Sequence, residues 1–98
     1  MDKRYFLNWL DSYERQCCRK PCLGITEMQF KHRAFYLSAI HDIKAKIQNS
    51  DVSPFTVVQN YADFCKQYSE RHNDAAFIFL VSYSAAEDIL RYWSESQK

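Results

Sequence analysis

Apolar side chains recur at steps of three and four along most of this chain, which is the spacing of one face of an α-helix. Polar residues occupy the opposite face of the first such stretch. Pro21 and Gly24 interrupt the pattern, so a first helix is predicted over about 2–19. Its apolar stripe consists of Tyr5, Phe6, Trp9, Leu10, Tyr13 and Cys17.

The segment ITEMQF begins the second predicted helix. Thr26 is a suitable N-cap, and Gln29 three residues later completes a capping box. Ile25 and Phe30 are spaced for a hydrophobic staple across this start. The helix is expected over about 26–48, with one buried face made of Phe30, Ala34, Leu37, Ile40, Ile43 and Ile47.

Two further helices follow the loop QNSDVSP. Ser53 is a natural N-cap and Pro54 suits the first helical position, which predicts a helix over about 54–72. Asn73 or Asp74 then caps a fourth helix to about residue 94. Apolar residues cover more than one face of this helix, so we expect it to be the most buried of the four.

Four helices, at about 2–19, 26–48, 54–72 and 74–94, with short loops predict an all-α single domain over residues 1–98, arranged as an antiparallel bundle. Composition agrees with this fold class. One glycine and two prolines leave few turn residues for a sheet protein, and a hydrophobic content of 47% excludes disorder. The chain's 98 residues accommodate one core.

The longest apolar stretch, at 75–86, is shorter than the roughly 20 residues that cross a bilayer. Charges interrupt the first residues before any apolar run forms, so no secretory signal is visible. We therefore expect a cytoplasmic protein without membrane contact, whose thiols are reduced.

Three of the four cysteines lie in CCRKPCLG, residues 17–24. Cys18 and Cys22 have the spacing of one zinc-ligand pair, but the second pair is missing. The end of a helix raises a thiol pKa, which disfavours a catalytic cysteine. The favoured interpretation makes Cys17 and Cys65 small core residues, with no metal or cofactor, although metal binding by Cys17, Cys18 and Cys22 stays open.

Catalytic patterns are not found. Glu87 and Asp88 are adjacent and therefore point to different parts of a helix surface, and no Glu-x-x-His motif occurs. A single glycine leaves no room for a glycine-rich phosphate loop. We expect a protein that is not an enzyme.

Charge is divided unevenly between the two halves. Residues 1–49 carry nine Lys/Arg and five Asp/Glu, whereas residues 50–98 carry four and seven, so the halves have net charges of +4 and −3. This asymmetry favours an acidic partner for the first half, docking of the two halves on each other, or head-to-tail association of copies of the chain.

A nucleic-acid alternative arises from VSPFTV, residues 52–57, which resembles the start of a helix-turn-helix recognition helix. The glycine typical of the preceding turn is missing. The resemblance implies base contacts from the new helix and phosphate contacts from a basic patch at 15–33. The candidate contacts are Ser53, Thr56, Gln59 and Asn60 for bases, and Arg15, Arg19, Lys20, Lys31 and Arg33 for phosphates.

The favoured interpretation is a non-catalytic module for protein–protein interaction or self-association. The fourth helix is apolar nearly all round and the first adds large aromatic residues, so a four-helix domain leaves part of this surface exposed. A second copy of the chain is the simplest partner. The candidate interface residues are Tyr5, Trp9, Tyr13, Tyr83 and Trp93.

Overall fold

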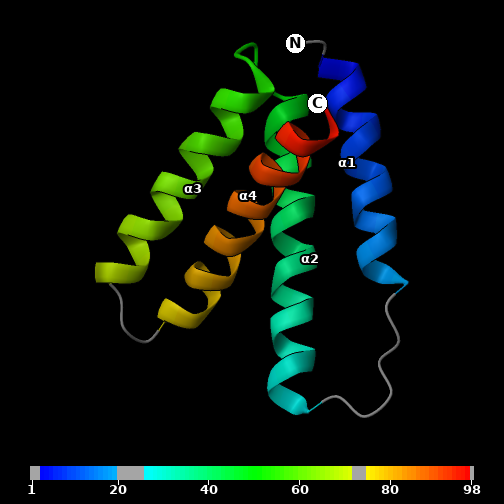
Figure 1. The fold of residues 1–98 in the computed structure, drawn as a ribbon. Helices are drawn as coiled ribbons and strands as arrows, with labels where there is room; N and C mark the ends of the chain where they lie inside the picture. Colours follow the sequence, from blue (N-terminus) through cyan, green and yellow to red (C-terminus); the bar gives the residue numbers. More distant parts are fainter. Residues whose placement is uncertain (1–2, 20–25, 72–74, 98) are drawn as a thin grey trace.

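The computed structural model describes residues 3–19, 26–71 and 75–97. It contains four helices, α1 (Lys3–Cys18), α2 (Glu27–Gln48), α3 (Pro54–Arg71) and α4 (Ala76–Ser96). Consecutive helices run in opposite directions, so that the start of α1 and the end of α4 lie at the same end of the molecule (Figure 1). The predicted all-α antiparallel bundle is confirmed, and every helix boundary agrees with its prediction to within two residues.

Local side-chain chemistry explains where α2 and α3 begin. Thr26 Oγ1 accepts a hydrogen bond from the Gln29 backbone N–H at 3.2 Å, and Gln29 Oε1 accepts one from the Thr26 N–H at 2.9 Å, which confirms the capping box. Pro54 occupies the first position of α3 as predicted. The predicted caps Asn73 and Asp74 and the staple residue Ile25 lie outside the described residues.

Most of the core lies at one end of the bundle, which we call the closed end. It combines the first half of α1, the second half of α2, the first half of α3 and the second half of α4. Every helix contributes fully buried side chains to one cluster there, so this end is a packed four-helix core. The cluster consists of Phe6, Leu10, Ile40, Ile43, Ile47, Val57, Val58, Ala62, Ala86, Ile89 and Trp93.

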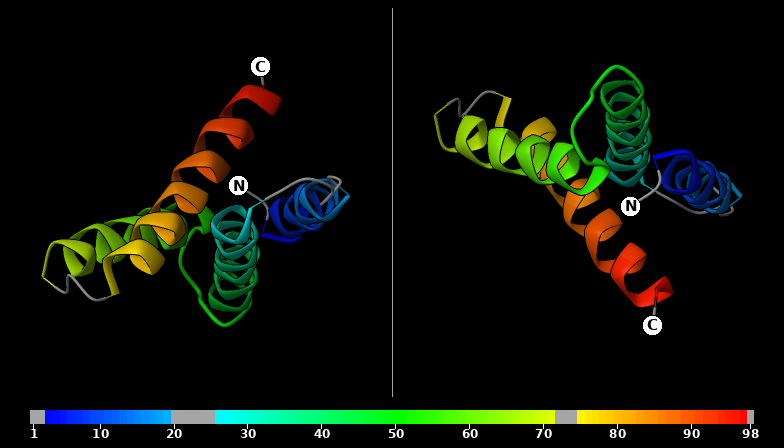
Figure 2. Two further views of the ribbon diagram at one scale, coloured as in Figure 1. Left: turned by 90° about the horizontal axis from the view of Figure 1, so that it is seen from below. Right: turned by 90° about the horizontal axis from the view of Figure 1, so that it is seen from above.

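The opposite end, which we call the open end, comprises residues 27–37 of α2, 64–71 of α3 and 76–84 of α4. The α3–α4 pair diverges from α2 toward this end (Figure 1), and α1 and α3 lie on opposite sides of α2 and α4 (Figure 2). Within these ranges the buried residues belong to α3 and α4 alone and are Cys65, Ser69, Val81 and Ser82.

Part of the predicted burial is therefore wrong. Phe30 is 59% exposed and Ala34 is also exposed, although both were predicted on the buried face of the second helix. For Phe30 the reason is length: Arg33 already reaches the last carbonyls of α1, so the turns of α2 before it extend past the end of that helix. Ala34 lies level with the end of α1 but on an exposed face of α2. The first turns of α4 are also exposed, including Ile78 and Leu80, so its predicted burial holds only beyond them.

Three cations hold α1 against α2. Lys3 Nζ donates to the carbonyls of Gln48 and Ser50 at 3.0 Å each, at the end of α2. Arg33 Nη2 donates to the carbonyls of Cys17 and Cys18 at 3.0 and 2.6 Å, at the end of α1. Both side chains compensate the negative end of the other helix.

Lys44, between these two, forms ion pairs with Asp11 at 2.8 Å and Glu14 at 3.2 Å. The hydrogen bond with Asp11 is the main cause of a raised Lys44 pKa. Three of the nine Lys and Arg residues in the first half of the chain therefore serve the packing of α1 on α2.

Candidate functional site: a cleft between three helices

A cleft of about 690 Å³ lies between α1, α2 and α4. Its aromatic walls are Trp9 and Tyr13 of α1, Tyr36 of α2 and Tyr92 of α4, and Asp88 contributes a carboxylate. The Trp9 and Tyr13 rings stack at 5.5 Å with an interplanar angle of 10°, and the Tyr13 and Tyr92 rings lie 5.7 Å apart. The rest of the lining is largely polar and includes Ser12, Gln16, Gln29, His32 and Arg33. A hollow of this size that combines aromatic walls with polar groups is suited to bind a ligand or a side chain.

A hydrogen-bond chain crosses the cleft from α1 through α2 to α4. Tyr36 Oη donates to Asp88 Oδ2 at 2.8 Å, and the Tyr13 and Tyr36 hydroxyl oxygens are 2.6 Å apart. Each tyrosine has one hydroxyl hydrogen, so Tyr13 must donate to Tyr36 when Tyr36 donates to Asp88. The chain therefore has a fixed direction, toward the carboxylate.

Both hydroxyls of this chain are protonated at neutral pH, as for any tyrosine, and burial keeps them so at more alkaline pH. Desolvation raises the pKa of Tyr13 to about 12. Desolvation, followed by the hydrogen bonds with Tyr13 and Asp88, raises the pKa of Tyr36 above its ordinary range. At neutral pH the two hydroxyls therefore act as hydrogen-bond donors along the chain and carry no charge.

Arg91 lies at the rim of the cleft. Its Nη2 is 3.3 Å from Asp88 Oδ1 and 2.9 Å from Tyr92 Oη, and its guanidinium carbon lies 4.7 Å from the centre of the Tyr92 ring. The hydrogen bond with Tyr92 is the main cause of a raised Arg91 pKa. The carboxylate and the ring thus already contact one guanidinium group of the protein itself.

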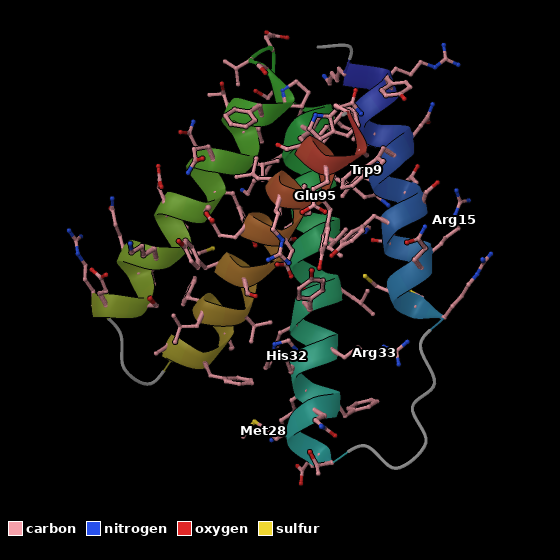
Figure 3. All side chains as sticks on the ribbon, viewed as in Figure 1. Trp9, Arg15, Met28, His32, Arg33 and Glu95 are labelled. Atoms are coloured by element: carbon pink, nitrogen blue, oxygen red, sulfur yellow. The ribbon has the colours of Figure 1, made fainter. Side chains whose placement is uncertain are left out.

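His32 and Arg33 line the other side of the cleft, on α2 (Figure 3). The His32 ring stacks near Tyr36 at 6.1 Å and meets Phe77 of α4 edge-on at 6.5 Å. Arg33 reaches the end of α1, as its hydrogen bonds to Cys17 and Cys18 require. The positive charge of Arg33 is therefore directed at the helix terminus.

The five candidate interface residues fall in different environments. Trp9 and Tyr13 line the cleft, and Tyr83 is half-buried against the core. Tyr5 is 59% exposed, although its ring meets Trp93 edge-on at 5.7 Å. Trp93 itself is only 5% exposed and belongs to the core, so the accessible candidates are the other four.

The cysteines in the described part of the chain differ in burial. Cys65 is 1% exposed and burial raises its pKa, as a small core residue requires. Cys17 is half-buried against the core and Cys18 is exposed, while Cys22 lies outside the described residues. Among the residues the structure describes, no group of three or more His, Cys, Asp or Glu is placed to hold a metal ion.

The candidate nucleic-acid contacts are not brought together. Ser53, Thr56, Gln59 and Asn60 lie at the start of α3, whereas Arg15 and Arg33 lie on the far side of α2, beside α1 (Figure 3). Gln59 donates to Asp63, and Lys31 pairs with Glu27 at 3.4 Å. Arg19 is exposed and Lys20 lies outside the described residues. Among the described candidates, the phosphate contacts therefore do not adjoin the base contacts at the start of α3.

Sequence reasoning missed Tyr36, Asp88 and Tyr92 as cleft residues. Asp88 had been considered only as the neighbour of Glu87, and the two do point apart, since Glu87 is exposed and Asp88 half-buried. A usable signal was present, because Asp88, unlike Glu87, lies three residues after Ala85 and four before Tyr92, on the helix face that those two residues share. An acidic residue on such a face requires a partner.

Exposed apolar side chains gather at the open end. Seven of the large hydrophobic residues that are more than one-third exposed belong to it: Met28, Phe30, Phe64, Tyr68, Phe77, Ile78 and Leu80. Some are already partly organised, since Phe64 and Tyr68 contact Phe79, and Phe77 contacts Phe35. The open end therefore presents aromatic surface from three helices.

Within residues 3–19, 26–71 and 75–97, none of the helices has the length and apolar character that crossing a membrane requires. The chain was also compared with protein-family models, with curated proteins and with solved structures, and none of the three comparisons finds a match. Its function must therefore be inferred from the cleft and the open end themselves.

Proposed function

We propose that this chain is a non-catalytic module for protein–protein interaction or self-association, and that its contact surface is the open end. The observation that carries the proposal is the concentration of exposed apolar side chains there, on α2, α3 and α4. Large exposed apolar patches on small domains mark interaction surfaces, and aromatic residues and methionine are enriched in them.

The packing of the closed end supports the same proposal. Fully buried residues of all four helices form the core at that end, so the fold does not need the open end as a second core. Leu80, at 53% exposed, and Met28, at 61%, lie in helices whose other halves are fully packed. A partner that covers the open end would remove this apolar surface from water without changing the core.

The test is to measure molar mass by light scattering after size-exclusion chromatography, over a wide range of protein concentration. We expect a concentration-dependent mass, or binding of an apolar dye by the monomer. Replacing Met28 and Leu80 together by glutamine, which suits a helix, should reduce either signal. A strictly monomeric chain that binds no apolar dye would contradict the proposal.

The matched control replaces Val52 and Phe55 by threonine and glutamine. These residues are 53% and 46% exposed but lie at the closed end, Val52 just before α3 and Phe55 in its first turn. The control should leave mass and dye binding unchanged. If both pairs of substitutions reduced association or dye binding equally, any exposed apolar surface would produce these signals. That result would refute the open end as the specific contact site.

A further inference from the structure

We infer that the cleft between α1, α2 and α4 binds a basic side chain, a guanidinium or an ammonium group, of the partner protein. This inference rests on the proposed function, since it names the chemistry of a contact that the same partner makes. The cleft opens beside His32, which contacts both Tyr36 of the cleft and Phe77 of the open end, so one partner can reach both surfaces.

Hydrogen-bond direction is the first argument. Tyr13 uses its hydroxyl hydrogen toward Tyr36, and Tyr36 uses its hydrogen toward Asp88. The oxygens of both hydroxyls and of the carboxylate can then only accept further hydrogen bonds. A group with several donors and no acceptor complements these three oxygens, and among protein side chains that description fits arginine and lysine.

Charge and aromatic walls are the second argument. Asp88 supplies a negative charge, and its side chain is 28% exposed, so it is accessible to a partner. The faces of Trp and Tyr rings attract cations, and Trp9, Tyr13 and Tyr92 line the same cleft. Arg33, the cationic residue among the lining, is directed at the carbonyls of Cys17 and Cys18 and compensates the end of α1.

Arg91 provides the third argument, because its guanidinium group already makes within the chain the kind of contact that we infer for the partner. Its guanidinium contacts both the Asp88 carboxylate and the face of Tyr92. The Arg91 side chain is 59% exposed, so it lies at the rim and can be displaced. We expect the partner's cation to replace Arg91 on the Asp88 carboxylate. It would lie deeper in the cleft than Arg91 does, closer to the hydroxyl oxygens.

The probe is the blocked tripeptide acetyl-Gly-Arg-Gly-amide, with acetyl-Gly-citrulline-Gly-amide as its uncharged isostere. Amide NMR shifts and the fluorescence of the two tryptophans, Trp9 and Trp93, report binding. We expect the arginine peptide to shift residues 9–17, 32–37 and 88–92, and the citrulline peptide to bind at least about tenfold more weakly, because it lacks the charge-assisted contact.

Two variants test the geometry. Asp88→Asn keeps the shape and an acceptor for Tyr36 but removes the charge, and it should weaken the arginine peptide about tenfold. Arg91→Gln removes the internal competitor and should tighten the same peptide several-fold. Equal binding of arginine and citrulline peptides, or no effect of Asp88→Asn in a variant whose spectrum shows an intact fold, would overturn the inference.

The source of the cation is tested with ethylguanidinium ion. If it binds as tightly as the peptide, the site selects a free small cation and the assignment to a partner protein is wrong. The two proposals fail separately: loss of peptide binding with unchanged self-association or dye binding refutes the cleft alone. Loss of dye binding and association with intact peptide binding refutes the open end alone.

Discussion

At the closed end all four helices contribute fully buried side chains, whereas at the open end α2 contributes none between residues 27 and 38 and the burial that remains lies between α3 and α4. The same helix is therefore a core element over one half and a surface element over the other. The difference shows how a chain of 98 residues can build its core at one end and leave apolar surface exposed at the other.

The most direct test of this difference shortens one side chain in each half of α2. Ile43 is fully buried, so Ile43→Ala should lower the free energy of unfolding by about 2–5 kcal/mol through lost burial and the cavity left behind. Met28 is 61% exposed and buries little surface, so Met28→Ala should change the free energy of unfolding by less than about 0.5 kcal/mol. Chemical denaturation measures both.

Comparable losses at both positions would show that the first turns of α2 are covered in solution. In that case a concentration dependence of the Met28→Ala effect would indicate that a second copy provides the cover, because only self-association makes stability depend on protein concentration.

The next largest effect concerns the ion pairs between α1 and α2. The Lys44 side chain is 17% exposed and contacts both Asp11 and Glu14, so Lys44→Met should cost about 1–2 kcal/mol of unfolding free energy while keeping the apolar stem. Lys31→Met is the matched control, since its pair with Glu27 is exposed at 56% and 84% and should contribute less than about 0.5 kcal/mol. Equal losses of unfolding free energy in Lys44→Met and Lys31→Met would contradict the conclusion that the Lys44 ion pairs hold α1 against α2.

A smaller effect is expected from the cap at the start of α2. Without tertiary cover, these turns depend on the capping box, so Thr26→Ala should lower local stability by about 1 kcal/mol and increase amide exchange of residues 27–31 about fivefold. Thr26→Ser keeps the hydroxyl and should behave like the parent. Unchanged exchange in Thr26→Ala would mean that packing, not the cap, holds this helix end.

The helices and their starts were predictable because they are local. A period of 3.6 and a cap within three residues of Thr26 are visible in any window of the sequence. The asymmetry between the ends was not predictable. It arises because α2 extends past the end of α1 and because α3 and α4 together diverge from α2. Apolar periodicity reports that Phe30 shares a face with Ile40, not whether another helix reaches it.

The cleft was less predictable for the same reason. Tyr13 and Tyr36 are 23 residues apart and Tyr36 and Asp88 are 52 apart, so no local pattern links them. Trp9 and Tyr13 were predicted as interface residues from their size and position on the first helix. The sequence does not reveal the register of α1 against α2 and α4. That register brings aromatic rings of all three helices into one cleft with the Asp88 carboxylate.

The smallest expected effect is a pH dependence that reports on this hydrogen-bond chain. Burial raises the pKa of Tyr13 from 10.0 to about 12, so between these values the unfolded chain loses a proton that the folded chain keeps. Stability should therefore be complete below about pH 10 and fall as the pH rises toward 12. Tyr36, whose pKa is raised above its ordinary range, and Tyr61, whose pKa burial raises to about 12, contribute in the same direction.

Tyr13→Phe should flatten this dependence, measured as the free energy of unfolding in urea across the same range. The change is modest because Tyr13 keeps part of its surface in water, where solvent screens the cost of ionisation. An unaltered slope in Tyr13→Phe would mean that Tyr13 ionises alike in the folded and unfolded chains. The hydroxyl would then not be held inside the cleft, and the directed chain toward Asp88 would lose its first member.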